Sequence, residues 1–257
     1  MTSITPERWH ERFRQQAGWT YELRKHLFEQ IGVQPSAKIL EPGCGTGAVL
    51  SEITGWGSQH VFGLDLNLEY LHLAFENAPG VHLAGGDAHH LPYARDSFDV
   101  IFCHYLLLWV MEPDAVVKEM ARVTRWGGFV LLLAEPDYGG RIDHPQELDP
   151  LGKYQTAALR RQRADPEIGR RLTGLLSRAG LKDVQGGVLG GGWAGAPSTA
   201  DWEIEWQVLR DDLDQLNGEG RINRAKLDVL QNIDRKAWQD GERVLFVPTF
   251  YAWGKKR

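Results

Sequence analysis

The chain has 257 residues, of which 42% are hydrophobic and 25% charged, a mixture typical of globular proteins and unlike that of disordered or fibrous ones. Its net charge of −5 lacks the basic excess of proteins that bind nucleic acid. Two cysteines are too few for a secreted disulfide framework, and the sequence shows neither a secretory signal nor an apolar stretch of the roughly 18 residues that span a membrane. We therefore expect a cytoplasmic protein.

The first half of the chain alternates between helical and extended patterns. Residues 1–34 predict a helical cap with two helices, from about Pro6 to Ala17 and from Trp19 to Ile31. Over residues 35–136 the predicted strands are Lys38–Glu41, Val61–Asp65, Val81–Ala84, Phe98–Cys103 and Phe129–Ala134. The helices between them are Thr46–Ile53, Leu68–Asn77 and Glu112–Arg122. Such alternation predicts βαβ units and a parallel sheet.

The second half, residues 137–257, is more helical. Its predicted helices are Leu148–Arg163, Pro166–Ala179, Asp201–Leu216 and Asn223–Trp238, and its predicted strands are Val184–Leu189 and Arg243–Trp253. No clear linker divides the chain. We therefore expect one domain over residues 1–257, with a substrate-side half that carries a helical insertion over about residues 197–240.

A glycine loop follows the first predicted strand. The run Glu41-Pro42-Gly43-Cys44-Gly45-Thr46-Gly47 lies between a strand and a helix, where ligands enter open α/β sheets. Glycine lets the backbone turn sharply and approach a ligand closely. The glycine spacing differs from the dinucleotide pattern G-x-G-x-x-G, and the Glu41 carboxylate would repel a pyrophosphate. The loop therefore favours a ligand with ammonium and sulfonium centres, with an ordinary strand–helix turn as the alternative.

Two aspartates follow the next two strands. Asp65 lies about 20 residues after the glycine loop, where a carboxylate can accept both hydroxyls of a ribose; a helix N-cap is the alternative. Asp87 can accept from the exocyclic amino group of adenine while the backbone N–H of Ala88 donates to a ring nitrogen. A simple turn aspartate is the alternative for Asp87.

Together these features resemble the class I S-adenosylmethionine-dependent methyltransferases, and among them the small-molecule branch typified by quinone-biosynthesis enzymes, methyltransferase type 11. The resemblance covers roughly residues 31–136. It implies a Rossmann-like, doubly wound α/β sheet of seven strands with the last strand antiparallel, and helical lid additions. It also implies that S-adenosyl-L-methionine is bound by Glu41, Gly43, Cys44, Gly45, Thr46, Gly47, Asp65, Leu66, Asp87, Ala88 and His104.

The candidate residues for chemistry follow the fourth and fifth strands. His104 and Tyr105 are the candidate catalytic residues, with His104 as a general base or as a residue that only packs on the cofactor. The candidate substrate contacts are Asp137, Tyr138, His144 and Trp193, and the candidate aromatic walls are Trp9, Trp19, Trp193, Trp202 and Trp206. No C-x-x-C or H-x-x-x-H spacing occurs, so no metal site is expected.

The sequence thus predicts an enzyme that moves a methyl group to a small organic acceptor by in-line displacement, largely by aligning the reacting atoms. The expected partner is that acceptor, with no nucleic acid and no membrane, and a homodimer is left open. An RNA or protein methyltransferase and a non-catalytic S-adenosylmethionine-binding module are the alternatives. The acidic net charge disfavours RNA, and Glu41 disfavours an NAD-dependent oxidoreductase.

Overall fold

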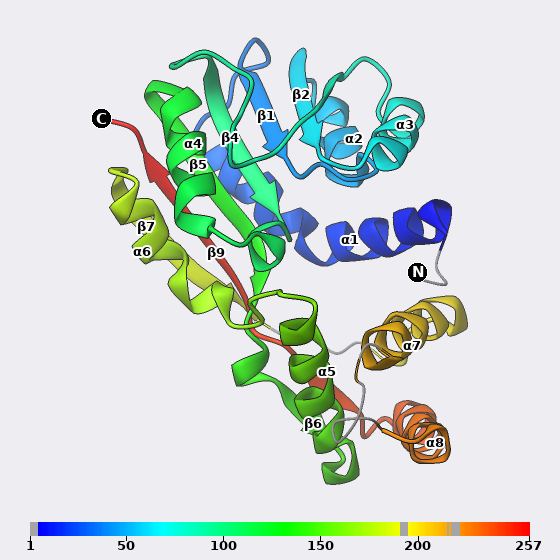
Figure 1. The fold of residues 1–257 in the computed structure, drawn as a ribbon. Helices are drawn as coiled ribbons and strands as arrows, with labels where there is room; N and C mark the ends of the chain where they lie inside the picture. Colours follow the sequence, from blue (N-terminus) through cyan, green and yellow to red (C-terminus); the bar gives the residue numbers. More distant parts are fainter. Residues whose placement is uncertain (1–4, 191–194, 215, 217–221) are drawn as a thin grey trace.

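The computed structural model describes residues 5–190, 195–214, 216 and 222–257. Its centre is a seven-stranded sheet with the order β3-β2-β1-β4-β5-β9-β7 (Figure 1). The strands are β1 (Lys38–Pro42), β2 (His60–Asp65), β3 (His82–Gly85), β4 (Phe98–His104), β5 (Thr124–Pro136), β7 (Lys182–Leu189) and β9 (Thr249–Lys255). Strands β1 to β5 are parallel, and β9 runs antiparallel between β5 and β7. The predicted fold class is confirmed.

Helices connect these strands and extend beyond the sheet. They are α1 (Pro6–Gln30), α2 (Ala48–Gly55), α3 (Leu68–Asn77), α4 (Pro113–Val123), α5 (Asp149–Arg161), α6 (Leu172–Arg178), α7 (Thr199–Asp214) and α8 (Arg224–Asp240). Short 3-10 turns are η1 (Leu107–Trp109), η2 (Tyr138–Gly140), η3 (Gln146–Leu148) and η4 (Ile168–Arg171). A separate antiparallel pair consists of β6 (Ile142–His144) and β8 (Val244–Phe246).

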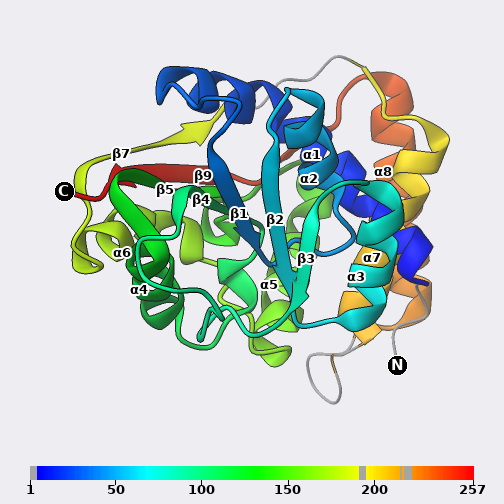
Figure 2. The same ribbon diagram turned by 90° about the horizontal axis from the view of Figure 1, so that it is seen from above.

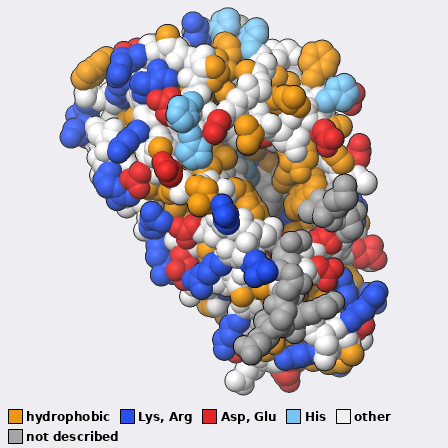
Figure 3. Space-filling view, viewed as in Figure 1, with side chains coloured by type: hydrophobic (Ala, Val, Ile, Leu, Met, Phe, Trp, Pro, Cys, Tyr) orange, Lys and Arg blue, Asp and Glu red, His pale blue; other side chains and the backbone are white. Residues whose placement is uncertain are grey.

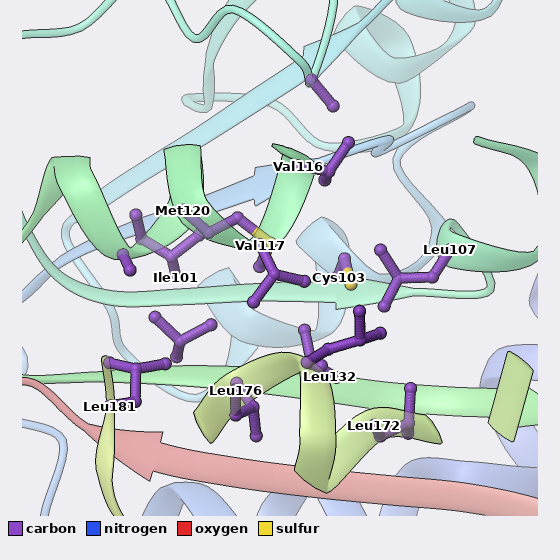
Figure 4. Packing of buried hydrophobic residues seen from close by; sticks show 14 of the residues in the cluster. Ile101, Cys103, Leu107, Val116, Val117, Met120, Leu132, Leu172, Leu176 and Leu181 are labelled. Carbon is purple, nitrogen blue, oxygen red and sulfur yellow. The ribbon is translucent and has the colours of Figure 1, made fainter. Parts of the chain in front are cut away.

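The sheet is covered on both faces, which is why its central strands are almost entirely apolar. Helices α4 and α6 pack on one face, where Met120 and Leu176 approach Ile101 and Leu132 (Figure 4). Helices α1, α2 and α3 cover the other face, on the opposite side in Figure 2. Burial of each such leucine or isoleucine stabilises the fold by roughly 1.5–3 kcal/mol.

A helical lobe stands beyond the sheet, where α5, α7 and α8 share a third core (Figure 1). Trp202 and Trp206 of α7 are buried in it. Both indole Nε1–H groups donate to Oδ2 of Asp234 in α8, over 2.7 and 2.9 Å, and Nε of Arg243 donates to Oδ1 over 2.6 Å. The prediction that these two tryptophans form walls of the ligand pocket is therefore wrong: they hold the lobe together.

Several predicted elements differ from the structure, among them Pro166–Ala179, which forms η4 and α6 rather than one helix, and two further differences have a clear physical cause. Residues 6–30 form one helix, because packing of α1 on α2 outweighs the cost of about 1 kcal/mol that Gly18 imposes inside a helix. The predicted strand Arg243–Trp253 is two strands, β8 and β9, separated by Val247 and Pro248. Pro248 has no N–H to donate to a ladder, so the chain leaves one sheet there and enters the other.

Candidate functional site

A cavity of about 390 Å³ lies at the carboxyl edge of the parallel strands. The chain places β2 on one side of β1 and β4 on the other, so the loops after β1 and β4 diverge and leave a crevice. Helices α1, α5 and α7 enclose the crevice from the other side. Figure 3 shows a hollow bordered mainly by hydrophobic side chains where these helices approach one another.

The glycine loop between β1 and α2 forms one wall of the cavity. Gly43 has φ 73° and Gly47 φ 80°, both in the left-handed region that favours glycine. A Cβ on Gly43 would lie 2.7 Å from Cδ1 of Leu106, and one on Gly47 would lie 3.1 Å from Cα of Ala74. The loop is therefore restricted to glycine by its own packing. Gly43, Cys44 and Gly45 line the cavity.

Glu41 lines the cavity with a carboxylate that lacks a full set of partners. The residue is 2% exposed, and its Oε2 atom accepts no hydrogen bond from any described residue. Burial raises the pKa of Glu41 well above its ordinary value, because a buried carboxylate loses its hydration. A cation in the cavity would supply the missing partner and favour ionisation. Glu41 is thus suited to a ligand ammonium group.

Asp65 lines the cavity beside the glycine loop. Its Oδ2 accepts from the backbone N–H of Gly45 and its Oδ1 from that of Asn67, both over 2.8 Å. The N-cap of α3 is Asn67, whose side chain accepts from the N–H groups of Glu69 and Tyr70. The alternative that Asp65 caps this helix is therefore excluded. A carboxylate held by two backbone donors keeps further lone pairs for hydroxyl groups.

Other predicted cofactor residues lie outside this cavity; they are Thr46, Gly47, Leu66, Asp87 and Ala88. The Thr46 hydroxyl lies 2.7 Å from Nδ1 of His10 and so joins the loop to α1. Leu66 is exposed, and Asp87 accepts from the backbone N–H of His89 over 2.9 Å. The adenine-binding role of Asp87 and Ala88 stays a prediction.

The predicted catalytic pair lines the cavity. Nε2 of His104 lies 2.8 Å from the Thr20 hydroxyl and 3.4 Å from Nη1 of Arg24. Burial and the Arg24 charge lower the pKa of His104 well below its usual range, so its ring is neutral near pH 7. Tyr105 has φ 53°, and burial raises the pKa of its phenol. Tyr105 therefore stays protonated near neutral pH, and a general-base role for His104 stays a prediction.

Of the predicted substrate contacts that the structure describes, Tyr138 alone lines the cavity. Burial raises its pKa to about 12. Asp137 instead accepts from Nη2 of Arg170 over 2.6 Å and is not among the residues that line the cavity. His144 belongs to β6 and is not part of the cavity wall. Trp193 lies outside the described residues, whereas Trp9 lines the cavity and Trp19 does not.

Sequence reasoning missed three charged residues in the cavity wall, Arg12, Asp211 and Asp212. Arg12 of α1 is 8% exposed and pairs with Glu205 of α7. Asp212 of α7 accepts from Nε2 of Gln162 over 2.9 Å and from Nε2 of Gln155 over 3.3 Å. A signal existed for Arg12, because Trp9, Phe13 and Gln16 recur on the same helical face. Nothing in the sequence alone places that face beside α7.

Two properties of the described residues bear on other classes of protein. No group of three or more His, Cys, Asp or Glu side chains within them could hold a metal ion. None of the described helices is long and apolar enough to span a bilayer.

The chain is similar to known methyltransferases. A family described as "Methyltransferase domain" matches residues 40–132. A demethylmenaquinone methyltransferase of Renibacterium salmoninarum is 32% identical over 124 residues, which cover 48% of this chain and 52% of that protein. The chain thus spans about half the length of this curated relative.

Two solved structures are similar in fold. The YcgJ protein of Bacillus subtilis aligns with a TM-score of 0.58 and 19% identity, over 91% of this chain and 97% of that one. Phosphoethanolamine N-methyltransferase 2 of Haemonchus contortus, in complex with S-adenosyl-L-methionine, aligns with a TM-score of 0.55 and 16% identity, over 92% of this chain and 52% of that one. Residues 40–132 are therefore similar to the methyltransferase domain family, and the whole chain shares its fold with these two solved structures.

Proposed function

We propose that the protein binds S-adenosylmethionine at the glycine loop and transfers its methyl group to a small organic acceptor. The observation that carries the proposal is the buried Glu41 carboxylate, whose Oε2 has no described partner in a cavity walled by a glycine loop and Asp65. A carboxylate that is buried without a hydrogen-bonding or ionic partner lowers the stability of the folded protein. A ligand with an ammonium group at one end and a ribose at the other would satisfy both carboxylates.

In this proposal different residues of the cavity wall bind different parts of the cofactor. Glu41 pairs with the methionine ammonium, Asp65 accepts from the ribose hydroxyls, and the glycine loop admits the ligand backbone closely. The bound cofactor supplies a methyl group already activated by its sulfonium centre. The chain contributes orientation and the exclusion of water, and such positioning can lower a barrier by roughly 7–11 kcal/mol in favourable cases.

The enclosure of the cavity supports a small acceptor rather than RNA or a folded protein. Residues of α1, α5 and α7 cover the side of the cavity opposite the sheet, among them Gln16, Leu159 and Val208. A macromolecular substrate would need an open approach, and RNA would need a basic surface. The net charge of −5 offers no such surface overall.

Calorimetry tests the cofactor assignment. We expect S-adenosylmethionine and S-adenosylhomocysteine to bind with comparable affinity and NADH not to bind. Incubation with methyl-labelled S-adenosylmethionine and a small-molecule extract should then give a labelled product. Tight binding of NADH alone would refute the assignment, whereas binding of both sulfur ligands without any transfer would favour a non-catalytic binding module.

Two further expectations belong with this proposal. A homodimer would appear in sedimentation analysis as twice the chain mass of 29.0 kDa. A cytoplasmic location likewise stays a prediction, which fractionation of cells would test.

A further inference from the structure

One wall of the cavity carries polar groups that cofactor binding does not use. Arg12 comes from α1, Tyr138 from η2 and Asp212 from α7. Arg12 and Asp212 both act electrostatically on the Tyr138 phenol, and Arg12 acts on Asp212 as well. These three groups therefore share one region of the cavity, on the side that the helices provide.

Arg12 offers a hydrogen-bond donor that no described residue uses. Its Nη1 group donates to the side chains of Gln15 and Glu205, whereas none of the residues in the described ranges accepts from its buried Nε–H. The guanidinium is also stacked over the Trp19 ring, 4.8 Å from the ring centroid, which fixes its orientation. An unsatisfied buried donor costs free energy, and since Arg12 lines the cavity a ligand can supply the acceptor.

Asp212 offers the complementary acceptor. Its carboxylate is held by two neutral amide groups, those of Gln155 and Gln162. Within the described part of the chain no salt bridge joins Asp212 to a cation. Burial raises its pKa, so the carboxylate takes up a proton more readily than an exposed aspartate does.

We infer that the methyl acceptor is a phenol or an enol, bound by its hydroxyl group between Arg12 and Asp212. A hydroxyl accepts from Arg12 through its oxygen and donates its proton to Asp212. A protonated amine has no lone pair for Arg12, and a carboxylate has no proton for Asp212 and is repelled by it. Tyr105, Trp109 and Tyr138 offer flat walls for the ring that carries the hydroxyl.

The reaction that this binding mode supports is O-methylation. The hydroxyl oxygen attacks the methyl carbon, and an O–C bond forms as the C–S bond breaks. The electron pair of the C–S bond stays on sulfur, which becomes a neutral thioether. The hydroxyl proton passes to the Asp212 carboxylate and then to water. The Arg12 charge stabilises the developing oxyanion. This inference depends on the proposed function, because it requires the cofactor in the same cavity.

Three compounds with one ring system test the inference: 2-naphthol, 2-naphthylmethylamine, which is protonated at neutral pH, and 2-naphthoate. Each is titrated calorimetrically into protein saturated with S-adenosylhomocysteine. We expect 2-naphthol to bind about tenfold more tightly than either of the others, since a hydrogen bond to a charged group is worth about a factor of ten in affinity. When S-adenosylmethionine replaces S-adenosylhomocysteine, mass spectrometry should detect methylated 2-naphthol.

Two conservative variants and one control complete the test. Arg12→Lys keeps the charge but removes Nε, and Asp212→Asn keeps the shape but removes the proton acceptor. Each should reduce the preference for 2-naphthol by roughly tenfold while leaving the affinity for S-adenosylhomocysteine within about twofold. Asp214→Asn, an exposed position on the same helix, should change neither affinity.

The outcomes separate this inference from the proposed function. If S-adenosylhomocysteine does not bind the wild-type protein, the proposed function fails. If it binds but 2-naphthol does not, or the amine or the carboxylate binds as tightly as 2-naphthol, the inference alone is overturned. A preference for 2-naphthol that survives both Arg12→Lys and Asp212→Asn also overturns it.

Discussion

Individual carboxylates decide what this cavity can bind. Glu41 is nearly inaccessible, and its Oε2 has no described partner, so the folded protein bears the cost of a buried acid that a cationic ligand would remove. Glu41→Gln keeps the shape and removes the charge. We predict that it weakens S-adenosylhomocysteine binding about tenfold or more and leaves the free energy of unfolding without ligand equal or higher.

The measurements for Glu41 are calorimetric titration and urea denaturation of the variant. Glu22→Gln, on the exposed face of α1, is the matched control and should alter neither quantity. Unchanged ligand affinity in Glu41→Gln would show that the carboxylate does not contact the ligand.

Variants of Asp65 and Asn67 distinguish an effect on ligand binding from an effect on folding. Asp65→Ala should weaken S-adenosylhomocysteine binding by about 2–4 kcal/mol, because paired charged hydrogen bonds are worth roughly 1.5–3 kcal/mol each and do not add fully. Asn67→Ala removes the cap of α3 and should cost about 0.5–2 kcal/mol of stability with little change in ligand affinity. Calorimetry and thermal unfolding of both variants check this contrast, and equal losses of affinity would contradict it.

Among single residues, the sequence predicted the cavity wall beside the glycine loop better than the wall formed by the helices. Glu41 and Asp65, which line the cavity, could be named because their positions depend on strand ends and glycines along the chain. Arg12 and Asp212 could not, because each becomes part of the cavity only when α1 and α7 pack side by side. Such a contact between segments nearly two hundred residues apart leaves no pattern in a single sequence.

Among the elements, the turn after β4 is held by a buried carboxylate of the neighbouring strand. The Glu135 carboxylate in β5 is fully buried and accepts from the backbone N–H groups of Leu106, Leu107 and Leu108, over 3.0, 2.8 and 3.2 Å. It thereby fixes η1, which begins two residues after Tyr105. A side chain near the end of β5 thus holds the loop that follows the neighbouring strand, β4.

Glu135 also predicts a pH dependence of stability. Burial raises its pKa to about 7, and the three N–H donors offset only part of that rise. The folded protein therefore retains a proton that the unfolded chain has lost between pH 4.5 and about 7, so the free energy of unfolding falls as pH rises through this range. We predict that Glu135 contributes up to about 3 kcal/mol to this fall, at 1.36 kcal/mol for each pKa unit.

Denaturation of the wild type and Glu135→Gln at several pH values measures this contribution. The wild type should lose stability relative to the variant as pH rises from 5 to 8. Parallel curves for the two proteins would mean that Glu135 has an ordinary pKa, kept low by its three backbone donors.

Strands and helices were predicted well wherever local pattern determined them. The glycine loop, β4 and α3 occur close to the predicted positions, since apolar runs and caps define them. Two of the errors, the division of α1 and the undivided final strand, arose where tertiary packing outweighed a glycine and where a proline separated two sheets.

In the whole molecule, a helical lobe lies beyond the sheet (Figure 1), and residues from both parts line the cavity. The lobe depends on Asp234, which accepts from two tryptophans and Arg243, all buried. Asp234→Ala leaves these donors unsatisfied and Arg243 short of one carboxylate partner. We predict a loss of about 3–5 kcal/mol in the free energy of unfolding, the usual cost of removing one partner of a buried ion pair.

Thermal and urea unfolding measure that loss. Asp240→Asn in the same helix removes only an exposed pair with Lys236 and should cost less than about 0.5 kcal/mol. A similar small loss in Asp234→Ala would show that the lobe is held by its apolar core alone.

The account as a whole depends on one binding mode, and a crystal structure of the protein with S-adenosylhomocysteine tests it most directly. The account predicts electron density in the cavity between the glycine loop and α1, with the ligand ammonium within hydrogen-bond distance of the Glu41 carboxylate and the ribose hydroxyls on Asp65. Density at another site, or a ligand in this cavity with its ammonium group away from Glu41, would contradict it.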